Sequence, residues 1–131
     1  MRFKKKLATI DTQDALIGNM TYDLASLIDD VRFKTNKKLK YNIYNYYLKL
    51  NKSKIDRSFL LNDFEIFSVI RNMKIIGIFA RLAVIDKKKK YLKLIPHAWK
   101  LIEHRTQNNQ IFNNLKKLLD INFSKKIRNI R

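Results

Sequence analysis

The sequence predicts a mainly helical single domain that begins with one short β-hairpin. Three observations lead to this prediction. Apolar residues recur at spacings of three and four along most of the chain, as on the buried face of a helix. Only residues 2–10 form short apolar arms around a lysine turn, which is the pattern of a hairpin. With 131 residues, 46% of them hydrophobic, the chain can build a core but not more than one domain.

The hairpin is followed by a loop, residues 11–20, that carries Asp11, Gln13 and Asp14. A carboxylate just beyond a short buried strand is held rigidly at a sheet edge and suits a hard cation that carries phosphate oxygens. Short strands also end in Asp for turn chemistry alone. The spacing therefore leaves Asp11 as either a metal ligand or a turn residue.

Five helices are expected after this loop. The first begins near Asp23, where the helix dipole favours a negative charge, and carries Asp29 and Asp30 on its solvent side. The longest is apolar on nearly all sides from Ile75 onward, which predicts a central buried helix in which Gly77 permits close packing. The apolar face expected for the first helix comprises Leu24, Leu27, Ile28 and Val31. The five expected ranges are 22–33, 39–50, 56–85, 95–106 and 110–119.

Two groups of side chains have both a functional and a structural interpretation. The tyrosines of residues 39–50 stand beside lysines, as in platforms that stack single-stranded nucleic acid, but their helical spacing favours an ordinary amphipathic helix. Three cations, Arg71, Lys74 and Arg81, lie on the long helix, and buried arginines need a carboxylate or phosphate partner. They are candidates for the wall of an anionic sugar or nucleotide site, or for structural ion pairs with an aspartate.

The composition restricts the kinds of partner and location. A formal net charge of +18 attracts nucleic acid, nucleotides and anionic lipid, although abundant Lys, Asn and Ile share A/T-rich codons and base composition could supply much of the lysine. The absence of cysteine excludes disulfides and thiolate metal sites. The absence of a long uncharged apolar run predicts no membrane span, and no secretory signal is recognised, so we expect a cytoplasmic protein.

Two sequence blocks resemble one enzyme superfamily. The first is Ile10-Asp11-x-Gln13-Asp14-Ala15-Leu16-Ile17-Gly18 followed by Tyr22-Asp23-Leu24-Ala25-Ser26-Leu27, and the second runs from Arg71 to Leu82 and on to Asp86, Tyr91-Leu92 and Ile95-Pro96. Together they resemble the C-terminal part of the aminoglycoside phosphotransferase/choline kinase superfamily, most of all the branch that phosphorylates the cell-wall amino sugars N-acetylmuramate and N-acetylglucosamine. The resemblance covers about residues 1–105. It implies that the chain is part of the helical C-terminal lobe of a protein-kinase-like fold.

The resemblance also implies roles for individual residues. Asp11 corresponds to the aspartate that holds Mg²⁺ on the phosphates of ATP, with Gln13 and Asp14 beside it or facing the substrate. Asp23 corresponds to the helix-opening aspartate that supports the catalytic loop. The helix with Arg71, Lys74 and Arg81 would form the wall of the sugar site.

The chain departs from the family pattern in four respects. Thr12 stands where the family has an aromatic residue, Asn19 where it often has proline, and Ile70 where it has glutamine. The catalytic motif, roughly His-x-Asp-x-His-x-x-Asn, and the nucleotide-clamping lobe would precede Met1. We therefore expect no catalytic residue within this chain, no tight binding of ATP or Mg²⁺ by it alone, and no kinase activity in isolation.

Three hypotheses follow for the function. The chain is the C-terminal portion of an ATP- and Mg²⁺-dependent amino-sugar or aminoglycoside-like phosphotransferase, whose substrate is a small sugar. Alternatively, it is one half of a split kinase that regains activity with a separate N-terminal half. The hypothesis from a different class is a basic helical protein that binds nucleic acid through phosphate contacts.

Overall fold

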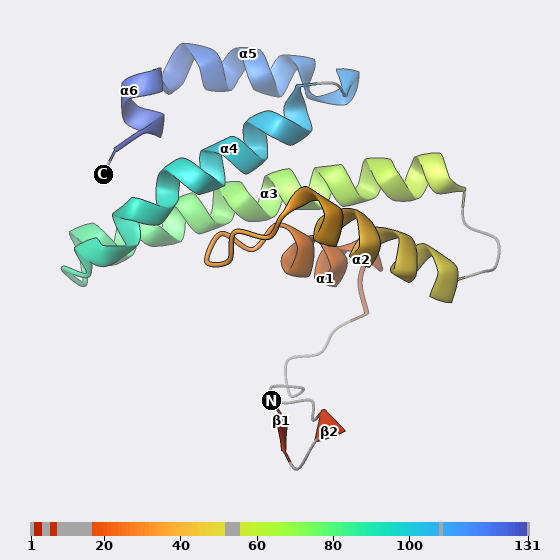
Figure 1. Ribbon diagram of the computed structural model, residues 1–131. Coiled ribbons are helices and arrows are strands. Elements are labelled where there is room, and N and C mark those ends of the chain that lie inside the picture. The colour runs from red at the N-terminus through yellow and green to blue at the C-terminus, as the bar shows by residue number, and fades with distance from the viewer. Residues whose placement is uncertain (1, 4–5, 8–16, 52–55, 108, 131) are drawn as a thin grey trace.

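The computed structural model describes residues 2–3, 6–7, 17–51, 56–107 and 109–130. Helices dominate these residues, as Figure 1 shows, so the predicted mainly α class is confirmed. Two short strands, β1 (Arg2–Phe3) and β2 (Lys6–Leu7), pair antiparallel with Arg2 opposite Leu7. The rest of the predicted hairpin, and Asp11, Gln13 and Asp14 of the loop, lie outside the described residues.

Two helices form one side of the molecule. Helix α1 (Thr21–Ile28) begins where Asn19 accepts hydrogen bonds from the backbone N–H and the hydroxyl of Thr21, at 2.9 and 2.7 Å. The Asn19 amide also donates to Asp63, which ties this helix start to α3. Helix α2 (Lys37–Leu50) is capped by Asn36, whose side chain accepts from the N–H of Leu39. Asparagine therefore occupies the N-cap position of α2, where it is a favoured residue, whereas in α1 the N-cap residue is Met20 and Asn19 binds from one position earlier.

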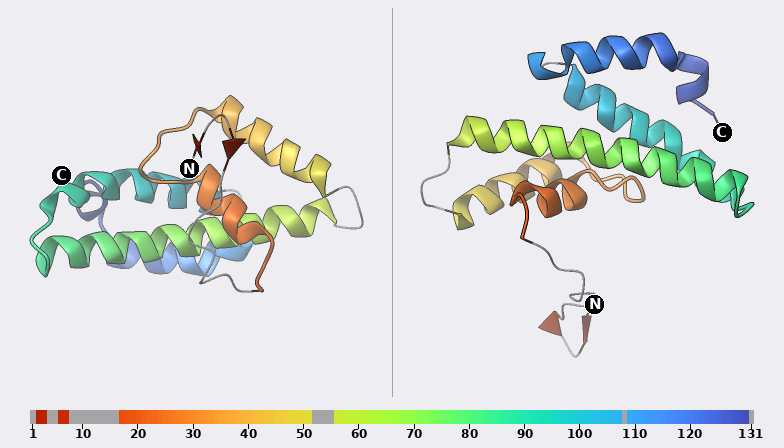
Figure 2. Two further views of the ribbon diagram at one scale, coloured as in Figure 1. Left: turned by 90° about the horizontal axis from the view of Figure 1, so that it is seen from below. Right: turned by 180° about the vertical axis from the view of Figure 1, so that it is seen from behind.

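The long helix α3 (Arg57–Val84) is the centre of the fold, and the expected range for it was 56–85. Helix α1 packs across the first part of α3, while α4 (Ile95–Thr106) runs beside it, as the views in Figures 1 and 2 show. The 3₁₀ segment η1 (Lys89–Leu94) returns the chain from α3 to α4. Pro96 lies in the first turn of α4, where its missing N–H costs no hydrogen bond.

The C-terminal elements cover the far side of α4. They are η2 (Gln110–Phe112), α5 (Asn113–Asn122) and the single turn α6 (Lys125–Arg128). Arg128 is buried, stacks over Trp99 at 4.9 Å and donates to Glu103, Asp120 and the carbonyl of Leu119. The sequence suggests a frayed basic tail for residues 124–131, which is wrong for the part described here. The guanidinium anchors the tail because it donates to the carbonyls of both Leu119 and Phe123 at the end of α5.

Two apolar clusters fill the interior. The larger joins α3, α4, η1 and α5 around Val69, Trp99 and Ile102, and the smaller joins α1 to α3 around Ile28 and Phe64. Tyr44 and Tyr47 of α2 pack against the smaller cluster, which agrees with an amphipathic helix rather than a stacking platform. Within the described residues, no helix is both long enough and apolar enough to cross a lipid bilayer.

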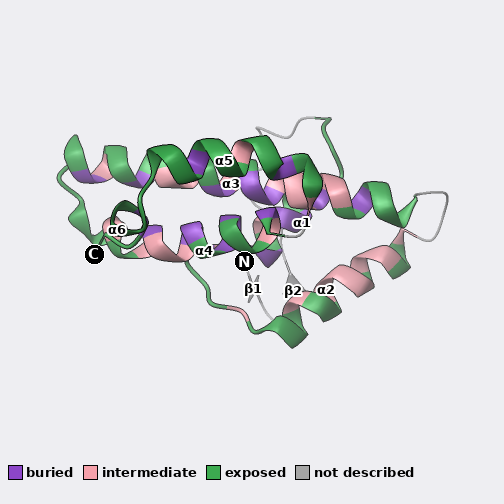
Figure 3. Cartoon of the chain, turned by 90° about the horizontal axis from the view of Figure 1, so that it is seen from above, coloured by how far each residue is buried: buried purple, intermediate pink, exposed green. Residues whose placement is uncertain are grey.

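Three sequence-based expectations about helix packing are wrong. Leu27 is 60% exposed, because the buried face of α1 is centred on Ala25 and Ile28 instead. Gly77 is exposed and a Cβ added there would meet no atom within 4 Å, so it is not a packing glycine. The second half of α3 is not buried all round, since Ile78 and Val84 are exposed. Figure 3 shows exposed stretches along α3.

Candidate functional site

Asp23 lies in the first turn of α1 and its residue is exposed. This position lets the carboxylate interact favourably with the positive end of the helix dipole. It also leaves Asp23 free to accept hydrogen bonds from groups outside the described residues. The exposed position of Asp23 is compatible with the supporting role expected for it.

The three cations of the long helix do not form one cluster. Lys74 and Arg81 share a face with Ile70, Met73, Gly77 and Val84, because these positions repeat at helical spacing, and all six are exposed. We call these six residues the exposed stripe of α3. Arg71 lies on the flank of the helix, close enough to Asp30 of the segment after α1 to help lower the pKa of Asp30. The candidate wall is therefore divided between a solvent-facing stripe and a partly buried arginine.

Arg71 has unused hydrogen-bonding capacity. Its Nη1 atom is buried and has no hydrogen-bond partner among the described residues. The carboxylate of Asp30 is mainly engaged by Arg32, at 2.6 Å, and this hydrogen bond is the main reason that the pKa of Asp30 lies below its usual value. Asp30 therefore pairs with Arg32, and Arg71 keeps a buried donor with no partner among the described residues.

The most highly connected charged group is Asp29. Its side chain is fully buried, although the sequence analysis places it on the solvent side of the first helix. Lys40 of α2 and Arg105 of α4 pair with its two oxygens at 2.7 and 3.0 Å, and Ser68 of α3 donates to it at 2.6 Å. Asp29 thus joins four segments of the chain, and we call these four residues the Asp29 cluster.

The electrostatics of Asp29 follow from these contacts. Burial by itself raises the pKa of Asp29, but the charge of Arg105 and the hydrogen bonds from Arg105, Lys40 and Ser68 outweigh burial and bring the pKa below its ordinary value. Asp29 is therefore ionised at neutral pH and offsets two cations that would otherwise repel each other. The sequence does not predict the burial of Asp29, because its partner Arg105 lies 76 residues away and no local pattern indicates that the two residues pair.

A second group of cations surrounds a concavity of about 680 Å³ between the end of α1 and the start of α4. Arg32, Lys34, Lys93 and Lys100 contribute the positive charge, and His97 lies among them. Burial lowers the pKa of His97, and the nearby Lys40, Lys34 and Lys100 lower it further. The positive charge around this concavity suits a phosphate-rich partner.

The described residues contain no group of three or more His, Cys, Asp or Glu side chains that could hold a metal ion. This finding does not bear on Asp11 and Asp14, which lie outside the described residues.

Comparison with known proteins gives sequence matches but no structural ones. No protein-family model matches the chain, and no solved structure matches it. Three curated proteins do match, and each is named N-acetylmuramate/N-acetylglucosamine kinase. The protein from Neisseria meningitidis is 34% identical over 66% of this chain. Those from Pseudomonas aeruginosa and Caulobacter vibrioides are 32% and 29% identical, each over 72% of this chain.

The match covers most of this chain but only a small part of each curated relative. It covers 26–29% of the length of each curated relative, so the chain spans little more than a quarter of these kinases. About seventy per cent of the present chain is thus similar to a minor portion of amino-sugar kinases.

Proposed function

We propose that this chain is the C-terminal portion of an ATP- and Mg²⁺-dependent kinase of the aminoglycoside phosphotransferase/choline kinase superfamily that acts on an amino sugar. The observation that carries the proposal is the similarity to three curated proteins named N-acetylmuramate/N-acetylglucosamine kinase. The mainly helical fold agrees with it. The acceptor would be a small sugar related to N-acetylmuramate or N-acetylglucosamine.

In this proposal Asp11 would hold the Mg²⁺ ion that accompanies ATP, and Gln13 and Asp14 would lie next to it or face the sugar. Magnesium there would neutralise the charge that develops on the phosphoryl group during transfer. Asp23 would support the loop that carries the catalytic base. Arg71, whose buried Nη1 has no hydrogen-bond partner among the described residues, would contribute to the wall of the sugar site.

The remaining part of the enzyme would come from residues outside this chain. The proposed partner is an N-terminal kinase half, in the same polypeptide or a separate one, which supplies the catalytic base and the nucleotide lobe. The apolar members of the exposed stripe of α3, Ile70, Met73 and Val84, are suited to contact with such a part. The chain alone should then show no kinase activity and no tight binding of ATP or Mg²⁺.

A chimera tests this proposal. The segment of the Neisseria meningitidis kinase that matches this chain would be replaced by the chain itself, and ATP-dependent phosphorylation of N-acetylmuramate would be measured. We expect activity in the chimera, loss of at least a hundredfold in Asp11→Asn, and little change in Asp86→Asn, an exposed acid used as the control. A chimera that folds cooperatively but is inactive would count against the kinase assignment. Activity of the isolated chain would refute the claim that it needs a partner.

A second candidate function is nucleic-acid binding, favoured by the net charge of +18 and by the concavity around Lys34, Lys93 and Lys100. Phosphate contacts predict an affinity that falls steeply with salt and does not need Mg²⁺. Binding of a labelled oligonucleotide at low and high salt separates the two candidates. Tight, salt-sensitive binding that is lost in Lys93→Ala/Lys100→Ala would favour this second function.

A further inference from the structure

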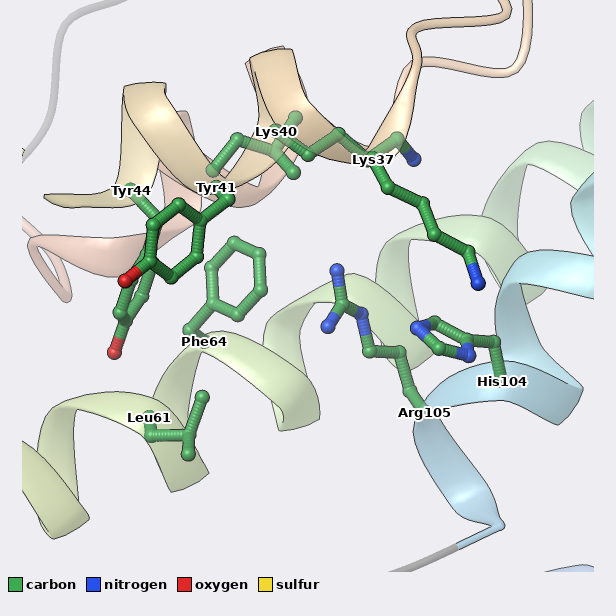
Figure 4. Close-up of a pocket in the computed structure, with 9 residues that line it drawn as sticks. Lys37, Lys40, Tyr41, Tyr44, Leu61, Phe64, His104 and Arg105 are labelled. Carbon is green, nitrogen blue, oxygen red and sulfur yellow. The ribbon is translucent and has the colours of Figure 1, made fainter.

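A cavity of about 360 Å³ lies beside the Asp29 cluster, between α2, α3 and α4 (Figure 4). Its size is within the range of small-molecule sites in proteins. One side is apolar and aromatic, formed by Tyr41, Tyr44, Leu61 and Phe64. The other side is basic, and includes Lys37, Lys40, His104 and Arg105.

Arg105 is held in a fixed position with part of its hydrogen-bonding capacity unused. Its Nε donates to Asp29 at 3.0 Å, and its guanidinium lies 4.7 Å from the ring centroid of Phe64. No hydrogen bond from its two terminal nitrogens is found among the described residues, and neither is buried without a partner. The outer edge of the guanidinium is therefore pre-arranged and open to a ligand.

The outer edge of an arginine guanidinium favours anionic groups with two oxygens side by side. Two parallel N–H donors of an arginine match the two oxygens of a carboxylate or phosphate. Because Nε is already hydrogen-bonded to Asp29, the guanidinium loses little further conformational freedom when its terminal nitrogens bind a ligand. Figure 4 shows Lys37 extended from α2 toward His104, with the Arg105 guanidinium between them and Phe64. Lys37 can thus add a second, mobile positive charge.

The charge balance also favours an anion. Lys37, Lys40 and Arg105 line the cavity with three positive charges, and no carboxylate is among its lining residues. Asp29, which pairs with Lys40 and Arg105 but does not itself line the cavity, offsets one of these charges. Glu65 is near Tyr44, whose pKa is raised first by burial and then by Glu65, but Glu65 does not line the cavity. A net positive charge remains beside an aromatic surface.

We propose that this cavity binds a small organic anion, with its carboxylate or phosphate on Arg105 and Lys37 and its ring or other apolar part on Tyr41 and Phe64. The proposal does not depend on the proposed kinase function, and its test uses neither ATP nor Mg²⁺. The two chemical sources of the anion are distinguished by the choice of probe.

The experiment is a calorimetric or NMR titration of the full chain with phenyl phosphate, benzoate, inorganic phosphate and benzyl alcohol. Binding of phenyl phosphate or benzoate at least tenfold tighter than both inorganic phosphate and benzyl alcohol is expected, because charge and ring both contribute. The better of the two organic probes identifies the preferred anionic group. Equal binding of inorganic and phenyl phosphate would refute the role of the aromatic side.

Matched variants locate the site. Lys37→Ala and Tyr41→Ala should each weaken binding about twofold to tenfold. Their controls are Lys38→Ala and Tyr46→Ala, which change exposed residues of the same helix that do not line the cavity. Arg105→Lys keeps the charge but removes the planar fork, and should weaken binding about tenfold to a hundredfold. Equal losses in a variant and its control would show that the probe binds only to the general positive surface, and would overturn the proposal.

Discussion

The first half of α3, residues 57–72, is packed on two sides, whereas its second half, residues 73–84, is packed on one. Helix α1 and helix α4 both contact α3, and α1 lies across the first half, as Figure 1 shows. Five residues of the first half are buried: Leu60, Phe64, Ser68, Val69 and Asn72. In the second half only Phe79 and Ala83 are buried.

The difference shows what an apolar sequence does and does not determine. The second half carries apolar residues on nearly every side, yet Val84 is 69% exposed, because no described element covers that face. The first half has a buried polar residue, Ser68, because the carboxylate of Asp29 is there to accept its hydrogen bond. Hydropathy sets the preference of a helix for burial, and the neighbouring elements decide which side is buried.

The largest effect is expected at the Asp29 cluster, which joins the first half of α3 to α1, α2 and α4. Asp29→Asn leaves Lys40 and Arg105 without their counter-charge, and losing one partner of a buried ion pair costs about 3–5 kcal/mol. Urea unfolding followed by circular dichroism measures this loss. The control is Asp30→Asn, whose partner Arg32 is exposed, with an expected cost of at most about 1 kcal/mol. Similar losses in both variants would mean that the cluster contributes no more than a surface pair.

Acid should weaken the same region. Because the pKa of Asp29 in the folded protein lies below 3.8, its contribution to stability is complete above about pH 5 and is lost as the pH falls through 3.8 and below. Lys40→Met removes one of the groups that lower this pKa, so the variant should lose less stability than the parent chain between pH 6 and pH 3. Lys38→Met, which changes an exposed lysine, should follow the parent profile. A parent-like profile in Lys40→Met would contradict the role of this ion pair.

The second half of α3 should tolerate, and even benefit from, a side chain at Gly77. No atom lies within 4 Å of an added Cβ, and alanine restricts the unfolded chain more than glycine does. Gly77→Ala is therefore expected to raise the free energy of unfolding by about 0.5–1 kcal/mol. Thermal unfolding measures the change. A destabilised variant would indicate that another element approaches Gly77 closely, as the sequence analysis expected.

The smallest effect is expected on the exposed stripe of α3. Val84→Lys should change the stability of the isolated chain by less than about 0.5 kcal/mol, because the side chain is already in water. Ala83→Lys, one residue earlier and 7% exposed, should destabilise the chain strongly, because it places a charge in the core. If Val84→Lys destabilises the chain as much as Ala83→Lys does, the exposed stripe of α3 is covered by a second copy of the chain or by another segment of the same chain. Analytical ultracentrifugation would identify that covering.

Parts of the candidate site could be predicted from the sequence, and parts could not. The first turn of α1 places Asp23 as expected, and the periodicity around residues 71–81 correctly predicts a helix there. The division of Arg71 from Lys74 and Arg81 was not predicted, because a set of charges on one helix does not reveal which flank a neighbour covers. The metal residues Asp11, Gln13 and Asp14 remain predictions.

The sequence by itself determined the local features of this protein: its main helices, the cap that Asn36 provides for α2, and the proline in the first turn of α4. These depend on residues a few positions apart, where periodicity and capping act. Only the tertiary structure decided that Asp29 is buried, that Arg128 anchors the C-terminal tail and that a basic cavity lies against Phe64. Each of these depends on elements far apart in the sequence, so the groups that satisfy a buried charge are identified only when the helices pack.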